Sequence, residues 1–319
     1  MTELQEKSII HLFPGSMRER WSYAAGHSSQ IQEIRLRCDR PVVILTHTGE
    51  CFMKEDGYYT DKPELAYRIN RKELDEILNY MCNYSIYAFE DEIRKGFLTM
   101  PGGHRIGIAG QAVLDDREGV KTIKHICYMN IRVANQIQGI ADVILPYLYQ
   151  NGRLENTLIV SPPGCGKTTL LRELIRQVSE GNAYGKGVTV GVVDERSEIA
   201  GSFMGVAQND VGMRTDVLDG CPKASGMMML VRAMGPKVIA VDELGGEEDY
   251  KALKRAAACG CGFLATVHGD GLTDLRGKQD EVKKLNRDLF SKYIVLTKNH
   301  GKPYIKGVYG KEFEPCYEW

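Results

Sequence analysis

The chain has 319 residues, 43% of them hydrophobic, so it is long enough for two domains that each bury a core. Its 41 Lys and Arg nearly balance its 42 Asp and Glu, which argues against nonspecific nucleic-acid binding through clustered positive charge. No run of 18 apolar residues predicts a membrane span, and the nine cysteines include no pair with zinc-site spacing. We therefore expect a cytosolic protein with reduced thiols, whose membrane role, if any, depends on a partner.

Residues 1–137 predict an α+β domain. Apolar residues in strand patterns predict strands at 31–37, 41–46, 104–110 and 121–125. Apolar residues on one helical face predict a helix over 72–81. Glycines and polar turn residues separate the later strands, which indicates a hairpin. We place a linker near 135–140 and a second domain at 138–319.

The second domain contains a glycine-rich turn directly after an apolar run. The turn and the residues that follow it are Ser161, Pro162, Pro163, Gly164, Cys165, Gly166, Lys167, Thr168 and Thr169. This order matches the phosphate-loop pattern G-x-x-x-x-G-K-[ST], except that Ser161 replaces the first glycine. We read Ser161 as tolerated variation. Backbone N–H groups and Lys167 are expected to bind the phosphates of ATP, and Thr168 is expected to bind Mg²⁺.

Two further apolar runs each end in Asp-Glu. The run at 188–193 ends in Asp194 and Glu195, and the run at 238–241 ends in Asp242 and Glu243. Carboxyl ends of parallel strands meet at one edge of a sheet, so both pairs are expected near the phosphate loop. Asp242 is the candidate for holding Mg²⁺. Glu243 is the candidate for activating the attacking water, with Glu195 as the alternative base.

A third strand is predicted at 262–269, after a helix over 251–259. Thr266 and His268 alternate with apolar residues and therefore lie on one face of this strand. At the carboxyl end of a central strand, both could hydrogen-bond to a γ-phosphate and lose that bond on hydrolysis. His268 is accordingly a candidate catalytic residue.

These segments together resemble the stage III sporulation AA family, a relative of the type II and type IV secretion ATPases. The resemblance rests on the phosphate loop and on 33–37, 101–110, 193–201, 230–239, Asp242-Glu243 and 265–269, which occur in one order. It implies an α/β, RecA-like P-loop ATPase motor that follows a smaller α+β domain and uses ATP and Mg²⁺. It also implies a homo-oligomer, a hexameric ring as in those relatives, that serves an integral membrane component of a sporulation channel at the inner face of the mother-cell membrane.

Arginines of the first domain are a further expectation from this resemblance. Secretion ATPases present arginines from their amino-terminal domains, and Arg105 and Arg132 fall at matching places. Positive charge supplied by a neighbouring subunit would stabilise the negative charge that develops at the β–γ bridge oxygen. The alternative is that both arginines form ordinary surface ion pairs.

Two other functions fit the same motifs. A RecA-like, nucleic-acid-dependent ATPase shares the phosphate loop and the acid strand, although the balanced charge argues against nucleic acid as a partner. A nucleotide-binding interaction module would bind ATP without hydrolysing it.

Overall fold

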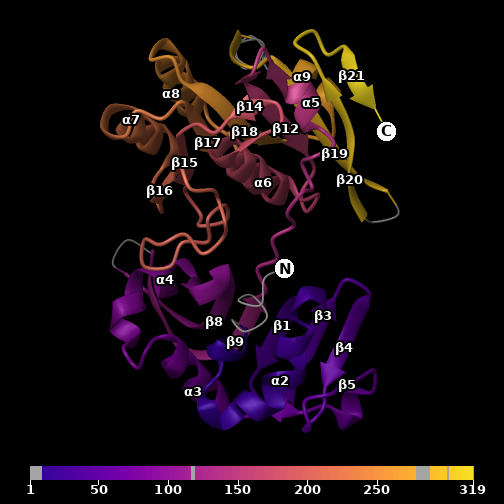
Figure 1. Cartoon of the computed structure of the whole chain (residues 1–319). Coiled ribbons are helices and arrows are strands. Elements are labelled where there is room, and N and C mark those ends of the chain that lie inside the picture. The colour runs from indigo at the N-terminus through magenta and orange to yellow at the C-terminus, as the bar shows by residue number, and fades with distance from the viewer. Residues whose placement is uncertain (1–8, 116–118, 278–287, 300–301, 319) are drawn as a thin grey trace. The chain divides into compact units, whose positions relative to one another are not determined.

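The structure is a computed structural model that describes residues 9–115, 119–277, 288–299 and 302–318. The chain divides into two compact units, each visible in Figure 1. The front unit combines the residues up to Gln136 with the segment Gly201–Gln208, and the motor unit combines Ile137–Ala200 with the residues from Asn209 onward. A division into two continuous pieces therefore leaves out Gly201–Gln208, which follows a motor strand in sequence and belongs to the front unit.

The front unit is built on a seven-stranded sheet with the order β5-β4-β3-β1-β9-β8-β7. All its neighbouring strands are antiparallel. The strands are β1 (Ile31–Arg37), β3 (Val43–Thr46), β4 (Gly49–Met53), β5 (Tyr59–Thr60), β7 (Phe97–Met100), β8 (His104–Leu114) and β9 (Val120–Arg132). The predicted hairpin is confirmed, with longer strands than expected, because β8 and β9 pair along most of their length.

Helices and short elements complete the front unit. They are α2 (Arg18–Gly26), α3 (Arg71–Met81), α4 (Glu90–Lys95), the paired strands β2 (Arg40–Pro41) and β6 (Arg68–Ile69), and the 3₁₀ turns η1 (Ile9–Leu12), η2 (Gly15–Met17), η3 (Ser28–Gln30), η4 (Pro63–Leu65), η5 (Ile86–Phe89) and η6 (Pro101–Gly103). The predicted helix over 72–81 is confirmed as α3. It begins at a capping box, in which the Asn70 side chain accepts from the Glu73 N–H and the Glu73 carboxylate accepts from the Asn70 N–H.

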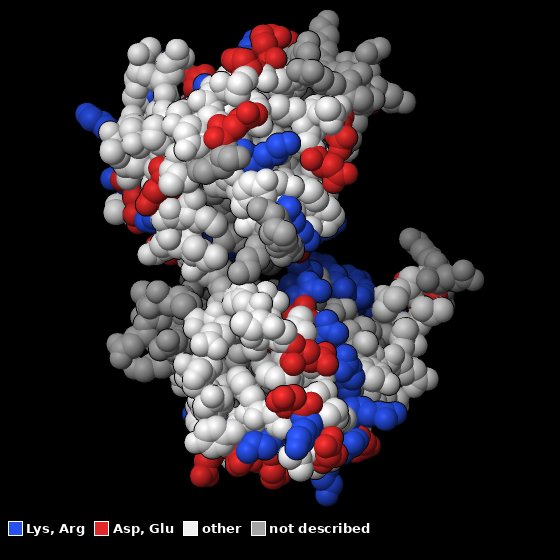
Figure 2. Space-filling view, turned by 90° about the vertical axis from the view of Figure 1, so that its right-hand side faces the viewer, with Lys and Arg blue, Asp and Glu red and all other residues white. Residues whose placement is uncertain are grey.

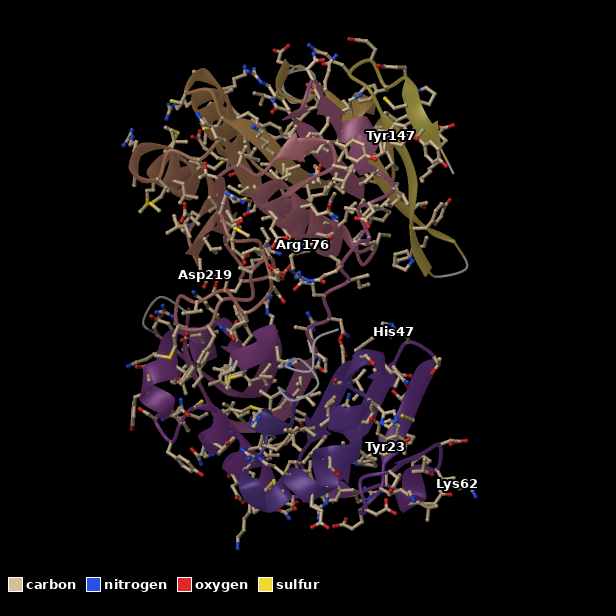
Figure 3. The ribbon with its side chains drawn as sticks, viewed as in Figure 1. Tyr23, His47, Lys62, Tyr147, Arg176 and Asp219 are labelled. Atoms are coloured by element: carbon tan, nitrogen blue, oxygen red, sulfur yellow. The ribbon has the colours of Figure 1, made fainter. Side chains whose placement is uncertain are left out.

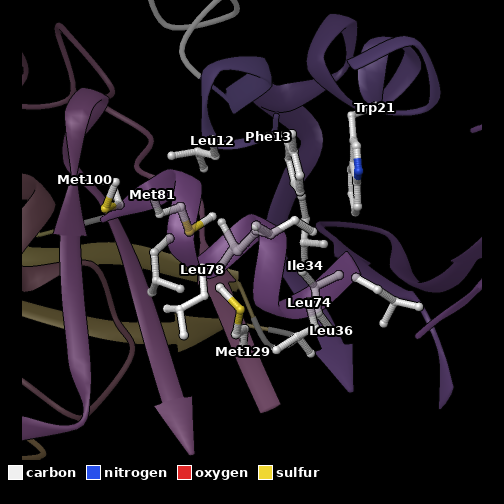
Figure 4. Close-up of a cluster of buried hydrophobic side chains, with 14 of the residues drawn as sticks. Leu12, Phe13, Trp21, Ile34, Leu36, Leu74, Leu78, Met81, Met100 and Met129 are labelled. Atoms are coloured by element: carbon white, nitrogen blue, oxygen red, sulfur yellow. The ribbon is translucent and has the colours of Figure 1, made fainter. Parts of the chain in front are cut away.

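One face of the front sheet forms the core of this unit (Figure 4). Ile34 and Leu36 of β1 are fully buried there, whereas the residues that alternate with them are not. Phe13 stacks on Trp21 with ring centroids 3.8 Å apart. Phe203, from the segment Gly201–Gln208, packs against the same core. This apolar contact accounts for the membership of that segment in the front unit.

The motor unit is built on an eight-stranded sheet with the order β16-β15-β17-β18-β12-β19-β20-β21. The strands are β12 (Thr157–Ser161), β15 (Val190–Asp194), β16 (Thr215–Asp219), β17 (Val238–Val241), β18 (Gly262–His268), β19 (Lys292–Asn299), β20 (Lys302–Tyr309) and β21 (Pro315–Glu318). The strands from β16 to β19 in this order are parallel, and β20 and β21 continue the sheet antiparallel. The predicted parallel α/β sheet is thus confirmed.

The helices of the motor unit are α5 (Leu145–Leu148), α6 (Lys167–Glu180), α7 (Lys223–Ala233), α8 (Glu247–Ala258) and α9 (Leu272–Gly277). Two small ladders join β10 (Tyr149–Gln150) to β11 (Arg153–Leu154), and β13 (Gly181–Asn182) to β14 (Gly185–Lys186). Within the described part of the chain, no helix is long and apolar enough to cross a membrane.

A buried acid on α6 fixes the start of the motor unit. Glu173 is 1% exposed, and its carboxylate accepts from the Gly139 N–H at 2.9 Å. Arg176, labelled in Figure 3, pairs with the same carboxylate at 2.6 Å. The helix that follows the phosphate loop is therefore tied to the first residues of its own unit.

Candidate functional site

The phosphate loop joins β12 to α6. Ser161 ends the strand, and Lys167 is the first residue of the helix. Gly164 and Gly166 have φ angles of 68° and 79°, a left-handed conformation that favours glycine. Ser161 is fully buried, and its hydroxyl donates to the Pro162 carbonyl at 2.8 Å. The serine that replaces the first glycine of the pattern is thus accommodated with its polar group satisfied.

The acids that follow β17 contact this loop directly. The Thr168 hydroxyl donates to Asp242 Oδ2 at 2.6 Å. Lys167 Nζ lies 2.5 Å from Glu243 Oε1, and His268 Nε2 lies 3.0 Å from the same ammonium and 2.9 Å from the same oxygen. The structure therefore brings together five of the predicted site residues from three elements.

Charge keeps Glu243 ionised. Burial by itself raises the pKa of this carboxyl, but the hydrogen bond and charge of Lys167, together with His268, outweigh burial and lower the pKa. Arg196 adds a second ion pair, with its Nη1 3.1 Å from Glu243 Oε2. Glu243 is therefore a carboxylate at neutral pH, as a group that accepts a proton must be.

Thr266 of β18 hydrogen-bonds to both Asp242 and Glu243. Its side chain is fully buried, and its hydroxyl accepts from the Glu243 N–H at 2.8 Å and donates to the Asp242 carboxylate. Glu243 has a φ angle of 55°, which is uncommon for a residue with a side chain and requires support from its surroundings. The sequence predicts that Thr266 hydrogen-bonds to a γ-phosphate. In the structure its hydroxyl instead bonds to the Asp242 carboxylate and the Glu243 N–H.

The acids Asp194 and Glu195, at the end of β15, have other partners. Asp194 is 2% exposed, and its carboxylate accepts from the N–H groups of Glu198, Ile199 and Ala200 at 2.8 to 3.0 Å. Burial raises the pKa of this carboxyl to about 6. Glu195 forms an ion pair with Lys223 of α7. The structure thus brings Glu243, and not Glu195, to the phosphate loop.

Arg172 is a buried residue of this region that the sequence analysis did not select. It lies on α6, and its guanidinium donates to the carbonyls of Glu198 and Ile199 at 2.7 and 2.5 Å. Asp194 thus binds N–H groups of the loop after β15, and Arg172 of α6 binds carbonyl groups of the same loop. The available signal was an arginine among the apolar residues of a helix that begins at Lys167.

Arg105 and Arg132 lie in the front unit. They face each other across β8 and β9 in the sheet register. The Arg105 guanidinium lies over the Phe97 ring, 3.8 Å from its centroid. Arg132 Nε is 3.6 Å from Glu33 Oε1. Their action on a nucleotide of a neighbouring subunit stays a prediction.

The donor set of the motor site fits a magnesium nucleotide. Thr168 and Asp242 offer hydroxyl and carboxylate oxygens, the ligands that Mg²⁺ takes when phosphates complete its coordination. The backbone around Gly166 is open, since a Cβ built there would meet nothing within 4 Å. Among the described residues, no group of three or more His, Cys, Asp or Glu could hold a metal ion by itself.

Known proteins resemble this chain over nearly its whole length. A model of the family described as "Sporulation stage III, protein AA" matches residues 3–314. Stage III sporulation protein AA of Bacillus subtilis (strain 168) is 40% identical over 306 residues, which cover 95% of each chain.

Solved structures of ATPases share the fold. The ATPase DotB of Legionella pneumophila has a TM-score of 0.61 at 15% identity, over 94% of this chain and 81% of that chain. The pilus retraction motor PilT, solved with bound ADP, has a TM-score of 0.59 at 14% identity, over 90% and 81%. These similarities confirm the predicted RecA-like α/β fold. The chain belongs to the sporulation stage III protein AA family.

Proposed function

We propose that the protein is a Mg²⁺-dependent ATPase that energises a membrane-bound, sporulation-associated secretion-like complex. One observation carries the proposal: Lys167 and Thr168 of the phosphate loop contact Glu243 and Asp242 at the end of β17. A loop that binds phosphate, an acid beside its hydroxyl and a second acid beside its lysine are the parts that phosphoryl transfer to water requires. The family and the fold support the role in sporulation and the kinship with secretion motors.

The contacts suggest a separate role for each of these residues in ATP binding and hydrolysis. Lys167 exchanges the Glu243 carboxylate for the phosphates of ATP when the nucleotide binds. Glu243 then keeps His268 as a partner and accepts a proton from the attacking water. Thr168 and Asp242 would hold Mg²⁺, and the ion would neutralise part of the phosphate charge.

A ring with arginines acting in trans is the second part of the proposal. We propose a homo-oligomer, a hexamer by analogy of fold, in which Arg105 and Arg132 of one subunit approach the nucleotide of the next. Both arginines belong to the front unit, whereas the phosphate loop belongs to the motor unit. Arg132 is also 63% exposed in its side chain, and such exposed pairs stabilise a fold by only about 0–1 kcal/mol.

Mixing two variants tests the arginines. Arg132→Ala and Lys167→Ala are each expected to be inactive, and a mixture is expected to regain activity where an intact loop meets an intact arginine. Mixed rings that form and stay inactive would contradict action in trans. So would full activity of dilute monomer.

The proposed place of action is the cytoplasmic face of a membrane in the mother cell, reached through an integral membrane partner. The family name supports sporulation, and the fold supports a motor that works on a membrane complex. Co-purification of the protein with membranes from sporulating cells, and its loss from membranes that lack the partner, tests this part.

A nucleic-acid-dependent ATPase is the alternative that one observation favours. Figure 2 shows Lys and Arg side chains gathered in a band along the front unit, although the net charge of the chain is −1. ATP turnover measured with and without single-stranded DNA separates the possibilities. Turnover that DNA leaves unchanged supports the proposed motor, stimulation by DNA supports the alternative, and binding without turnover supports an interaction module.

A further inference from the structure

Lys298 of β19 lies beside the glycine turn of the phosphate loop. The parallel register pairs Val160 of β12 with Val295 of β19, so Lys298 lies three residues beyond this pair, as Pro163 does on the other strand. A Cβ built on Gly164 would be 3.5 Å from Lys298 Nζ. The Lys298 ammonium therefore lies next to Gly164, in the space that a side chain at this position would approach.

This lysine approaches the loop from the side opposite the acids. The sheet order places β17 and β18 on one side of β12 and β19 on the other. Asp242, Glu243 and His268 all follow or end the first two strands, and they contact Lys167 or Thr168. The metal and the γ-phosphate belong to that side, because the proposed base and metal ligand are there. The β19 side is left for the other end of the nucleotide.

Lys298 also has a charge that no acid of the described residues neutralises. Lys167 and Arg196 both form ion pairs with Glu243. Lys298 is exposed, and within residues 9–115, 119–277, 288–299 and 302–318 no carboxylate forms an ion pair with it. A nucleoside triphosphate carries about four negative charges, more than one lysine and a divalent cation neutralise. A second ammonium at the loop is therefore favourable when the nucleotide binds.

We propose that Lys298 is a nucleotide-binding residue that contacts the α-phosphate and ribose end of ATP or ADP. The inference rests on the proposed function, in that the loop must bind a nucleotide. It adds a ligand contact from a strand that carries none of the phosphate-loop or acid motifs.

The position of Lys298 determines which kinetic constant it affects. The α-phosphate and ribose do not change charge during hydrolysis, so a contact with them is equally strong in the ground state and the transition state. Such a contact lowers KM and Kd and leaves kcat unchanged. ATP and ADP share this end of the molecule, so both are affected alike.

Equilibrium binding of ATP and of ADP, with steady-state turnover, tests the proposal on the full chain. Lys298→Met removes the charge and keeps the stem length, and Lys298→Arg keeps the charge. Lys306→Met is the matched control, because Lys306 is an exposed lysine on the neighbouring β20. We expect Lys298→Met to raise Kd for ATP and ADP about tenfold, the usual worth of one charge-assisted hydrogen bond, with kcat within about twofold. Lys298→Arg and Lys306→Met should bind like wild type.

Three results overturn the proposal. Unchanged Kd for both nucleotides in Lys298→Met shows that the ammonium does not reach the ligand, while the proposed ATPase stands. A fall in kcat with unchanged Kd places Lys298 at the reacting phosphate instead. Wild-type protein that binds neither nucleotide contradicts the proposed function and the Lys298 contact together.

Discussion

The ends of β15 and β17 carry the same pair of residues and use them differently. Both strands are buried, and they are direct neighbours in the sheet. β15 ends at Asp194 with Glu195 next, and β17 is followed by Asp242 and Glu243. At β17, the pair contacts the phosphate loop through Lys167 and Thr168. At β15, Asp194 binds three backbone N–H groups of its own loop and Glu195 pairs with Lys223.

Distance from β12 explains this difference. β17 is separated from β12 by β18 alone, whereas β15 lies one strand further away. The acids of β17 are therefore within reach of the loop. Asp194 of β15 instead fixes the loop that leads to Gly201–Gln208, and Glu195 pairs with α7. A motif of two acids gains its role from strand order, which is a property of the whole sheet.

Replacing each glutamate by glutamine should give the largest difference between the two strand ends. Glu243→Gln should bind ATP and slow its hydrolysis by about 10²–10⁴-fold, the usual contribution of a general base. Glu195→Gln should stay within about threefold of wild type, because Glu195 pairs with Lys223 of α7 and not with the phosphate loop. Single-turnover hydrolysis with bound ATP provides the measurement. If Glu195→Gln traps bound ATP while Glu243→Gln stays active, then Glu195 and not Glu243 is the general base.

The aspartates should differ in stability as the glutamates differ in rate. Asp194→Ala leaves three buried N–H groups without an acceptor, which we expect to lower the free energy of unfolding by about 3 kcal/mol. Asp242→Ala is the matched control, expected to abolish Mg²⁺-dependent turnover and to change unfolding by less than about 1 kcal/mol. Urea denaturation followed by circular dichroism measures both. Equal stability of the two variants would refute a structural role for Asp194.

Thr266 offers a smaller and more selective effect within the β17 site. Thr266→Val keeps the shape of the side chain and removes the hydroxyl that binds Asp242 and the Glu243 N–H. We expect turnover to fall about 10- to 100-fold, and more Mg²⁺ to be needed, because each acid loses one hydrogen bond worth about 1–3 kcal/mol. Thr266→Ser restores the hydroxyl and should restore most activity. Wild-type Mg²⁺ dependence in Thr266→Val would show that the acids need no such support.

The local patterns of the chain were enough to predict the phosphate loop, the strands β12, β17 and β18, and the α/β class. Each of these has a signature within about ten residues: a glycine turn before Lys-Thr, or an apolar run of strand length. The helix predicted at 251–259 starts earlier in the structure, at Glu247, where Asp249 accepts from the Gly245 and Gly246 N–H groups.

Other features depend on contacts between distant residues and have no local signature. β16 is a half-exposed strand with two aspartates among its five residues, so its sequence lacks a continuous apolar run. The segment Gly201–Gln208 belongs to the front unit through Phe203, which packs on a core formed far earlier in the chain. Lys298 reaches the phosphate loop only because β19 pairs beside β12. Packing on a distant core decided the membership of Gly201–Gln208, and strand pairing decided where Lys298 lies. Strand order also decided which glutamate contacts Lys167, namely Glu243.

Phosphate release from ATP by wild type and Lys167→Ala, with a melting curve of each protein, tests the central claim most directly. Lys167 is 8% exposed and its ammonium contacts Glu243 and His268, but its proposed task is to bind phosphate. We predict Mg²⁺-dependent phosphate release by wild type and none above background by Lys167→Ala, with both proteins folded at the assay temperature. Near wild-type release by folded Lys167→Ala would contradict the assignment of this loop as the catalytic ATP site.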